Sequence, residues 1–159
     1  MTKYVVCMIF VTAIISCKTL DSNVPVDQNT SQNNVNEDFS INLPENYFLK
    51  KNQGKDGVIY YFESTIDGIE RQHGEIFLGF HPGEVENYYT NKIETFSTNI
   101  LEEEVDIGIY FEKETYSTIA IIPLDGKGMP GMFVRIIGIE PNKEELYKLI
   151  NSFSTLTLK

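Results

Sequence analysis

The sequence is poor in the residues that most often carry chemistry. Its 159 residues include two cysteines, two histidines and no tryptophan. It contains no Gly-x-Ser-x-Gly elbow, no phosphate-binding Gly-x-x-x-x-Gly-Lys loop and no His-Glu-x-x-His motif. Basic residues are also scarce, because 13 Lys and Arg stand against 23 Asp and Glu, for a formal net charge of −10. Such a surface repels nucleic acid and anionic headgroups. The acidity is better explained by solubility than by attraction of a basic partner.

A hydrophobic run long enough to cross a membrane is missing too. The longest apolar run, Tyr4 to Ile15, spans about a dozen residues and follows one positive charge at Lys3. A helix needs roughly 20 apolar residues to cross a bilayer core. A charged start, a short apolar core and a small residue before a cut are instead the parts of a secretory signal peptide. Ser16 supplies the small residue, so we expect residues 1–16 to be a cleaved signal.

The residues around the second cysteine resemble a known processing signal. The tetrapeptide from Ile14 to Cys17, IISC, is similar to the bacterial lipobox, with an aliphatic residue at −3, a small residue at −1 and the cysteine. The resemblance implies that signal peptidase II cuts before Cys17, that this residue is the lipid attachment site through a diacylglyceryl thioether, and that its new amino group is often acylated. The alternative is an ordinary signal peptide with Cys17 near the cut by chance. Two or more acyl chains anchor stably, so we expect an anchored protein.

This interpretation leaves no thiol for other chemistry. Cys7 would leave with the signal peptide and Cys17 would carry the lipid. The folded domain would then have no disulfide, thiolate metal site or cysteine nucleophile, although an exported compartment permits disulfides. We expect no cofactor, and packing alone must hold the domain together.

Residues 17–38 comprise the cysteine and a polar segment rich in Asn, Gln, Ser, Thr and Asp. Such a segment cannot bury enough apolar surface to offset its ordering entropy, so we expect a flexible, disordered tether. Lys18 stands where enteric lipoproteins kept at the inner membrane have an aspartate, which favours the outer membrane, facing the periplasm or the cell surface. Residues 39–159 have the usual length of one domain with a single core.

Short runs of alternating or β-branched apolar residues predict strands along most of this domain. Asp67-Gly68 between two of the runs is a typical hairpin turn pair. Within one run, Tyr60 and Phe62 should share one face and Tyr61 the other. The runs are FSINL from Phe39, GVIYYFES from Gly57, GEIFLGF from Gly74, VDIGIYFEK from Val105, YSTIAIIPL from Tyr116, GMFVRIIGI from Gly131 and TLTL from Thr155.

Two segments show the helical period instead. The first follows Pro82, has carboxylates in its first turn at Glu84 and Glu86, and runs to Ile100. The second, NKEELYKLINSF, follows Pro141. Together with the strands, these helices predict an α+β domain in which a single antiparallel β-sheet carries two main helices packed on it. The two apolar stripes contain Val85, Tyr88, Tyr89, Ile93, Phe96 and Ile100, and Leu146, Leu149, Ile150 and Phe153.

The two ends of the domain resemble a known superfamily. FSINLPENYF from Phe39 is similar to the opening of the PsbP-like and DcrB-like superfamily, where an alternating strand runs into Leu-Pro and then an aromatic residue. LYKLINSFSTL from Leu146 is similar to its closing helix and strand. The resemblance implies the PsbP-like/DcrB-like fold. It also implies a binding role, since the superfamily includes bacterial lipoproteins, accessory subunits of larger assemblies, and chaperones and immunity proteins of contact-dependent secretion systems.

Few side chains suggest catalysis or metal binding. His73 with nearby Glu75, and His81 with nearby Glu84, could do acid–base work or bind zinc. Isolated histidines of this kind are nevertheless mostly surface residues, and we expect neither pair to make a site.

Two acidic segments could gather oxygen ligands for calcium. Glu102–Asp106, EEEVD, lacks a turn that would converge its oxygens, and Asp125–Gly128, DGKG, lacks oxygen ligands at alternate positions. Solvated charge is the expectation for both, with no metal.

Methionines and aromatic residues leave further alternatives. Met129 and Met132 could adapt to a partner surface from a flexible connection, or they could belong to the core. A set of aromatic residues could line a ligand or glycan groove, or fill the core and its rim. The set is Tyr60, Tyr61, Phe62, Tyr88, Tyr89 and Tyr110.

The anchor, the tether and the absent catalytic motifs favour one function. We expect a lipid-anchored cell-envelope lipoprotein that acts as a non-catalytic binding or accessory module for a protein partner in the envelope. The alternative is an immunity lipoprotein that neutralises a secreted toxin, which depends on the family resemblance and the acidic surface. An enzyme would depend on little more than His73 and His81.

Overall fold

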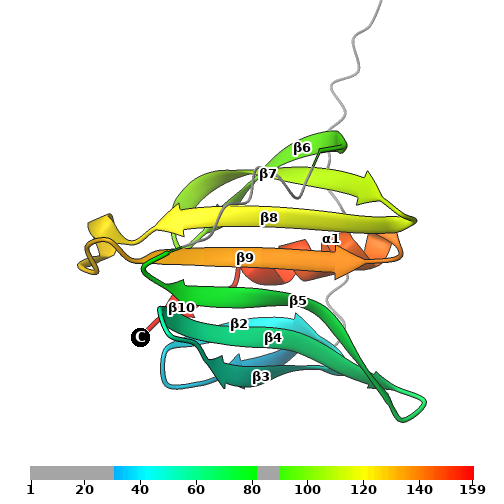
Figure 1. The fold of residues 1–159 in the computed structure, drawn as a ribbon, viewed down its shortest axis with the longest axis horizontal. Coiled ribbons are helices and arrows are strands. Elements are labelled where there is room, and N and C mark those ends of the chain that lie inside the picture. The colour runs from blue at the N-terminus through cyan, green and yellow to red at the C-terminus, as the bar shows by residue number, and fades with distance from the viewer. Residues whose placement is uncertain (1–30, 82–89) are drawn as a thin grey trace, which may run out of the picture.

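The computed structural model describes residues 31–81 and 90–159, which form ten strands, one α-helix and one 3₁₀ turn (Figure 1). Within these residues no helix is long and apolar enough to cross a bilayer. The elements are β1 (Ser31–Val35), β2 (Phe39–Pro44), β3 (Tyr47–Gln53), β4 (Gly57–Ile66), β5 (Ile69–Gly79), β6 (Lys92–Ile100), β7 (Glu103–Glu112), β8 (Thr115–Pro123), η1 (Asp125–Lys127), β9 (Phe133–Glu140), α1 (Lys143–Phe153) and β10 (Thr157–Leu158).

Two antiparallel sheets and one helix make up two layers. The large sheet has seven strands in the order β3-β4-β5-β9-β8-β7-β6, and the small sheet has three in the order β1-β2-β10. Figure 1 shows α1, β2 and β10 together behind the large sheet. Strand β2 and the helix thus close the core against one face of the large sheet, and no described helix or strand packs on the opposite face.

The helix α1 is positioned by its apolar stripe. Leu146, Leu149, Ile150 and Phe153 are all fully buried, as their spacing predicts. Gly138 on β9 lets the helix approach, because a Cβ there would lie 3.2 Å from both Leu146 Cδ1 and Leu149 Cδ2.

Several predicted strands are confirmed by their burial. The alternating residues of β2 point inward at Phe39, Ile41 and Leu43. Tyr60 and Phe62 are buried on the core face of β4, and Tyr61 faces the other way. The turn at Asp67-Gly68 joins β4 to β5 with φ values of 53° and 77°, the left-handed conformation that a tight hairpin requires.

The predicted α+β domain with two helices on the sheet is wrong, and so is the PsbP-like/DcrB-like arrangement that the resemblance implied. The protein is mostly β with a single α-helix among the described residues. The segment Lys92–Ile100, expected to be helical, is strand β6 and pairs with β7. Phe96 and Ile100 are four residues apart, a spacing that places two side chains on one face of either a helix or a strand. The β-branched Ile and Thr residues between and around them favour a strand. Residues 82–89 of the predicted helix lie outside the described part.

Besides β6, two strands were not expected. Strand β1 lies in the segment predicted to be a tether, and pairs with β2 along its whole length. The tether prediction is therefore wrong for Ser31–Val35, and its residues 17–30 lie outside the described part. Strand β3 follows a turn at Asn46, where φ is 70°, so the chain continues as sheet beyond the proline expected to end it.

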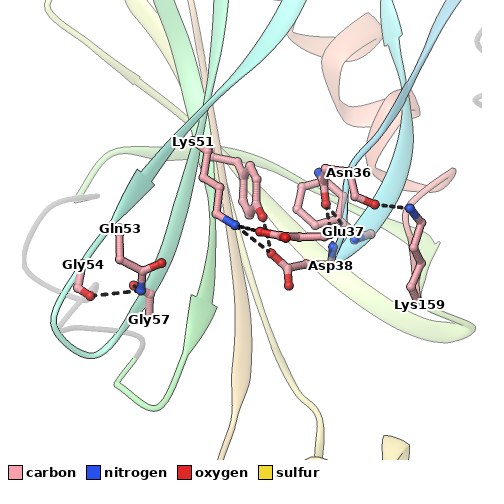
Figure 2. A network of polar contacts seen from close by, with 10 residues as sticks. Asn36, Glu37, Asp38, Lys51, Gln53, Gly54, Gly57 and Lys159 are labelled. Carbon is pink, nitrogen blue, oxygen red and sulfur yellow. Dashed lines mark hydrogen bonds and ion pairs between the residues drawn. The ribbon is translucent and has the colours of Figure 1, made fainter.

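Polar contacts fix the residues between β1 and β2 beside the end of the chain (Figure 2). Asn36 Oδ1 accepts a hydrogen bond of 2.9 Å from the backbone N–H of Asp38. Lys51 on β3 forms ion pairs with Glu37 and Asp38, and Lys159 Nζ donates to the backbone carbonyl of Asn36. The small sheet is thereby tied to the edge of the large one.

Candidate functional site: a buried polar cluster and an open sheet face

The predicted lipid attachment site, Cys17, lies outside the described residues, as do Glu84, Tyr88 and Tyr89. The two histidines are described and differ sharply. His81 is exposed, whereas His73 is only 7% exposed, so the surface location expected for His73 is wrong.

His73 belongs to a cluster of four polar side chains that we call the buried tetrad: Tyr47, Ser64, His73 and Glu140. His73 Nδ1 lies 2.8 Å from Glu140 Oε1, and His73 Nε2 lies 2.7 Å from Ser64 Oγ. The Tyr47 hydroxyl donates a hydrogen bond of 2.8 Å to the same oxygen of Glu140. All four residues are buried.

Four neighbouring strands build the tetrad, with Tyr47 on β3, Ser64 on β4, His73 on β5 and Glu140 on β9. A β-bulge in β5 positions the imidazole. Phe62 pairs with Gly74 and Glu63 with Gln72, so His73 between them has no Cα partner on β4. Such an extra residue re-aims a side chain without ending the strand.

Gly74 makes this bulge possible. Its φ of +144° is a conformation that L side chains rarely adopt, and a Cβ at this position would lie 2.0 Å from the carbonyl oxygen of Ile137. The bulge therefore requires glycine, and the imidazole next to it depends on this one backbone position.

In the tetrad the Ser64 hydroxyl contacts the imidazole, and the imidazole contacts a carboxylate. The same arrangement activates the serine nucleophile of a catalytic triad. A nucleophile must reach its substrate, yet Ser64 is 1% exposed and Glu140 is 2% exposed. Burial, and then the hydrogen bond to Glu140, raise the pKa of Tyr47, so its hydroxyl remains a neutral donor. In this conformation the tetrad can hold a proton between buried groups, but it cannot act on a molecule in solution.

Sequence reasoning missed three members of the tetrad because they are far apart in the chain. One signal was present. In strand β9 the core positions are Val134, Ile136 and Gly138, and strict alternation continues to Glu140, which places a carboxylate on the core face. Glu75, the carboxylate expected near His73, lies on the other face of the sheet.

The face of the large sheet opposite α1 is the second candidate. We call it the open face. Two rows of cross-strand neighbours run over it through β4, β5, β9 and β8. The rows are Ile59, Phe77, Arg135 and Ile121, and Tyr61, Glu75, Ile137 and Ile119, and Ile139 extends the surface along β9.

One ion pair lies inside this apolar surface. Arg135 Nη2 is 2.5 Å from Glu75 Oε1, and the Arg135 guanidinium lies 5.2 Å from the centre of the Phe77 ring. Since both charged side chains are more than four-fifths buried, the pair is a fixed polar point within an apolar face.

An acidic hollow adjoins the open face at Ile121. It has a volume of about 390 Å³ and is lined by carboxylates at Glu103, Glu104, Asp106 and Asp125. Lys127 lies 3.6 Å from Glu102 and 3.7 Å from Glu103. The described ion pairs leave Glu104 and Asp106 without a basic partner, so the potential at this end of the face is negative.

Glu102–Asp106 and Asp125–Gly128, the two acidic segments that could gather oxygens for calcium, lie around this hollow. Asp106 accepts a hydrogen bond from the Ser97 hydroxyl, and Asp125 Oδ1 accepts one of 2.7 Å from the backbone N–H of Gly131. Within residues 31–81 and 90–159, no three His, Cys, Asp or Glu side chains converge as a metal site would.

The remaining candidates divide between core and surface. Met129 and Met132 are partly buried against the core, which was the alternative to a partner-binding loop. Tyr60 and Phe62 belong to the core, whereas Tyr61 lies on the open face. The predicted aromatic set therefore does not line a single groove.

No family model matches the chain, and no curated protein matches it significantly. The function is therefore inferred from the geometry of the open face and of the buried tetrad.

Proposed function

We propose that the protein is a lipid-anchored binding module of the cell envelope, attached through Cys17 and without catalytic activity of its own. The observation that carries this proposal is the open face, an apolar sheet surface that no described helix or strand covers. The lipobox at Ile14 to Cys17 supports the anchor, because the chain offers no apolar run long enough to span a bilayer.

The open face differs from the solvated face of an ordinary antiparallel sheet. In such a sheet the outward positions are polar, so that strands alternate between apolar inside and polar outside. Here four outward positions of β8 and β9 carry isoleucine, at Ile119, Ile121, Ile137 and Ile139. Ile121 is 37% exposed and Ile139 is 39% exposed. Ile119 and Ile137 between them are partly exposed, and Phe77 is 7% exposed. Apolar side chains that remain exposed next to one another on a sheet face are typical of an interaction site.

The charges around the open face define the partner's chemistry. The acidic hollow next to Ile121 favours Lys or Arg side chains, and the domain's own acidity strengthens that attraction over longer distances. We infer a protein partner with an apolar centre and basic side chains at one margin. The ion pair between Arg135 and Glu75 would fix the register of the two surfaces.

Burial of the tetrad supports a binding role over an enzymatic one. The tetrad, which combines a hydroxyl, an imidazole and a carboxylate, is closed to solvent at Ser64. An immunity lipoprotein that neutralises a secreted toxin would use the same open face, and the identity of the partner separates this alternative from an envelope accessory subunit.

Site-specific photocrosslinking in intact membranes tests the proposal. A photoreactive phenylalanine derivative is placed in the full-length protein at Ile121, at Ile139 or, as a control, at Ile66. Ile66 is also an exposed isoleucine, at 44%, but it lies at the tip of the β4–β5 hairpin. We expect one crosslinked protein from the two open-face positions and none from Ile66. Crosslinks of equal yield from all three positions, or none from the open face, would contradict the proposal.

A further inference from the structure

The end of the β4–β5 hairpin extends beyond the strands on either side of it (Figure 1). Strand β3 pairs with β4 only as far as Ser64, and β9 pairs with β5 only from Gly74 onward. Residues 65–72, which we call the hairpin tip, therefore pair only with one another among the described strands, and all of them are exposed.

Two isoleucines lie at the hairpin tip. Ile66 and Ile69 are cross-strand partners on either side of the turn, so their side chains share one face of the hairpin. They are 44% and 60% exposed. The turn itself requires Asp67 and Gly68 but no apolar neighbour. Adjacent apolar side chains at a protruding, exposed position are typical of a protein or membrane contact.

The hairpin tip does not belong to the open face. Phe62 and Ser64 precede Ile66 by four and two residues on β4, and both are buried on the core side of the large sheet. Because side chains alternate along a strand, Ile66 and its partner Ile69 face this same side. They therefore face the side on which α1 and the small sheet lie.

The chain enters the domain at the same end of the large sheet. Ser31 is the cross-strand partner of Pro44 on β2, and a short turn leads from Pro44 to Tyr47. Tyr47 is in turn the partner of Ser64, the last residue of β4 before the hairpin tip. Cys17 can lie at most about 50 Å from Ser31, the length of the intervening chain when fully extended. A lipid on Cys17 would therefore hold the end of the domain that carries the hairpin tip near the bilayer.

The charges of the hairpin tip permit contact with a neutral lipid surface. The tip has two carboxylates, Asp67 and Glu70, and one guanidinium, Arg71, which give a net charge of −1 against −10 for the whole chain. Glu70 also lies 3.4 Å from the Lys50 ammonium. The tip thus lacks the strong acidity of the whole chain, which repels anionic headgroups.

We propose that the hairpin tip is a membrane-contact site, where Ile66 and Ile69 insert into the lipid surface that carries the Cys17 anchor. This inference rests on the proposed lipid attachment, but not on the identity of the protein partner. Two isoleucines bury too little apolar area to hold a protein at a membrane alone, whereas they can orient a domain that acyl chains already anchor. The open face lies on the other side of the sheet and stays accessible to the partner.

Tryptophan fluorescence of the lipidated full-length protein in vesicles tests the proposal. The chain has no tryptophan, so Ile66→Trp introduces a single reporter. The vesicles are phosphatidylcholine with or without bromine on the acyl chains, because bromine quenches a reporter in contact with lipid. We expect the emission of Ile66→Trp to shift to shorter wavelength on reconstitution and to lose intensity in the brominated vesicles. Ile139→Trp, the same change at an exposed isoleucine of the open face, should show neither effect.

Flotation of the same vesicles separates the anchor from the hairpin tip. If the protein floats with the vesicles but Ile66→Trp is equally bright with and without bromine, the membrane-contact proposal is overturned and the anchor stands. A wild-type protein that does not float contradicts the lipid attachment, and with it this inference.

A second substitution shows whether the native tip, and not the introduced tryptophan, makes the contact. Ile69→Asp combined with Ile66→Trp places a charge opposite the reporter, and a charge resists transfer out of water. The quenching by brominated lipid should then fall to the level of Ile139→Trp. Quenching that is unchanged by Ile69→Asp would also overturn the proposal.

Discussion

Arg135 on β9 and Glu75 on β5 form an ion pair at the centre of a sheet face that no described helix or strand covers. The neighbours of this pair along the two cross-strand rows are mainly aliphatic and aromatic. An exposed pair of this type would contribute little, but this one is largely removed from solvent. It places a largely buried pair of opposite charges among aliphatic and aromatic side chains, which suits recognition of a particular partner.

The lipid anchor is tested by labelling. In cells grown with labelled palmitate, the wild-type chain should carry the label and Cys17→Ser should not, because the thioether needs the thiol of Cys17. Cys7→Ser is the matched control, and it should be labelled like the wild type since Cys7 belongs to the predicted signal peptide. Label that persists in Cys17→Ser would exclude this site of attachment.

The β7–β8 hairpin offers a stabilising substitution. Its turn residues, Lys113 and Glu114, have φ values of 50° and 64°, which cost side chains free energy. Replacing them with Asn and Gly, the pair that suits this turn, should raise the free energy of unfolding by about 1 kcal/mol. Urea unfolding of the full-length protein measures the change as a higher midpoint with an unchanged slope.

The control for the hairpin is Lys55→Asn, which changes an exposed lysine in the β3–β4 turn. Its φ is not positive, so the free energy of unfolding should stay within about 0.5 kcal/mol. If the variant with Asn and Gly at positions 113 and 114 has no higher free energy of unfolding than this control, the left-handed turn residues are not strained.

Close packing of α1 on β9 predicts a strong effect at Gly138. In Gly138→Ala the added methyl would lie 3.1 Å from Thr118 Cγ2 and 3.2 Å from two leucine side chains of the helix. Overpacking of this kind should destabilise the domain by about 1–3 kcal/mol. Gly126→Ala is the matched control, because nothing lies within 4 Å of a Cβ there. Equal stability of the two variants, measured by thermal unfolding, would contradict this account of the packing.

The contact between β6 and α1 should depend on pH. The Lys143 ammonium and then the Tyr147 hydroxyl, both bonded to Glu94, lower the pKa of that carboxyl. A lowered pKa means that the stabilisation is present above the unfolded value of about 4.3 and is lost as pH falls through the folded value. Glu94 is partly exposed, so after solvent screening the contribution is about 0.5 kcal/mol.

The substitution Glu94→Gln should therefore lower stability at pH 7, and the difference from the wild type should disappear below about pH 4. Denaturant unfolding between these two pH values provides the measurement. Glu104→Gln, which removes a carboxylate without a described ion pair, should show no such convergence. If Glu94→Gln lowers the free energy of unfolding by the same amount at both pH values, the stabilisation does not come from the ionised Glu94 carboxylate.

The sequence predicted those elements whose burial leaves a clear period. The alternation of Phe39, Ile41 and Leu43 in β2 and the stripe of α1 both appear in the structure as predicted. Strand β6 was misread because Phe96 and Ile100 suit helical and strand periods equally. Only pairing with β7 decides between the two, and that pairing is a non-local interaction.

The candidate sites were less predictable than the strands. The tetrad combines Tyr47, Ser64, His73 and Glu140, whose positions meet only after four strands pair in order and β5 bulges at His73. No local pattern encodes that convergence. The open face could not be predicted for a related reason. The sequence does not show which face of β8 and β9 is covered by α1, so the outward isoleucines of these strands could equally belong to the core.

The central claim is that the open face binds a protein partner, and quantitative capture from gently solubilised membranes tests it most directly. The tagged full-length protein is compared with Ile139→Asp on the open face and with Ile66→Asp at the hairpin tip, two exposed isoleucines changed in the same way. The account predicts one near-stoichiometric partner for the wild type and for Ile66→Asp, and a loss of about tenfold in that partner for Ile139→Asp. Equal recovery with all three proteins, or a wild type recovered alone, would contradict it.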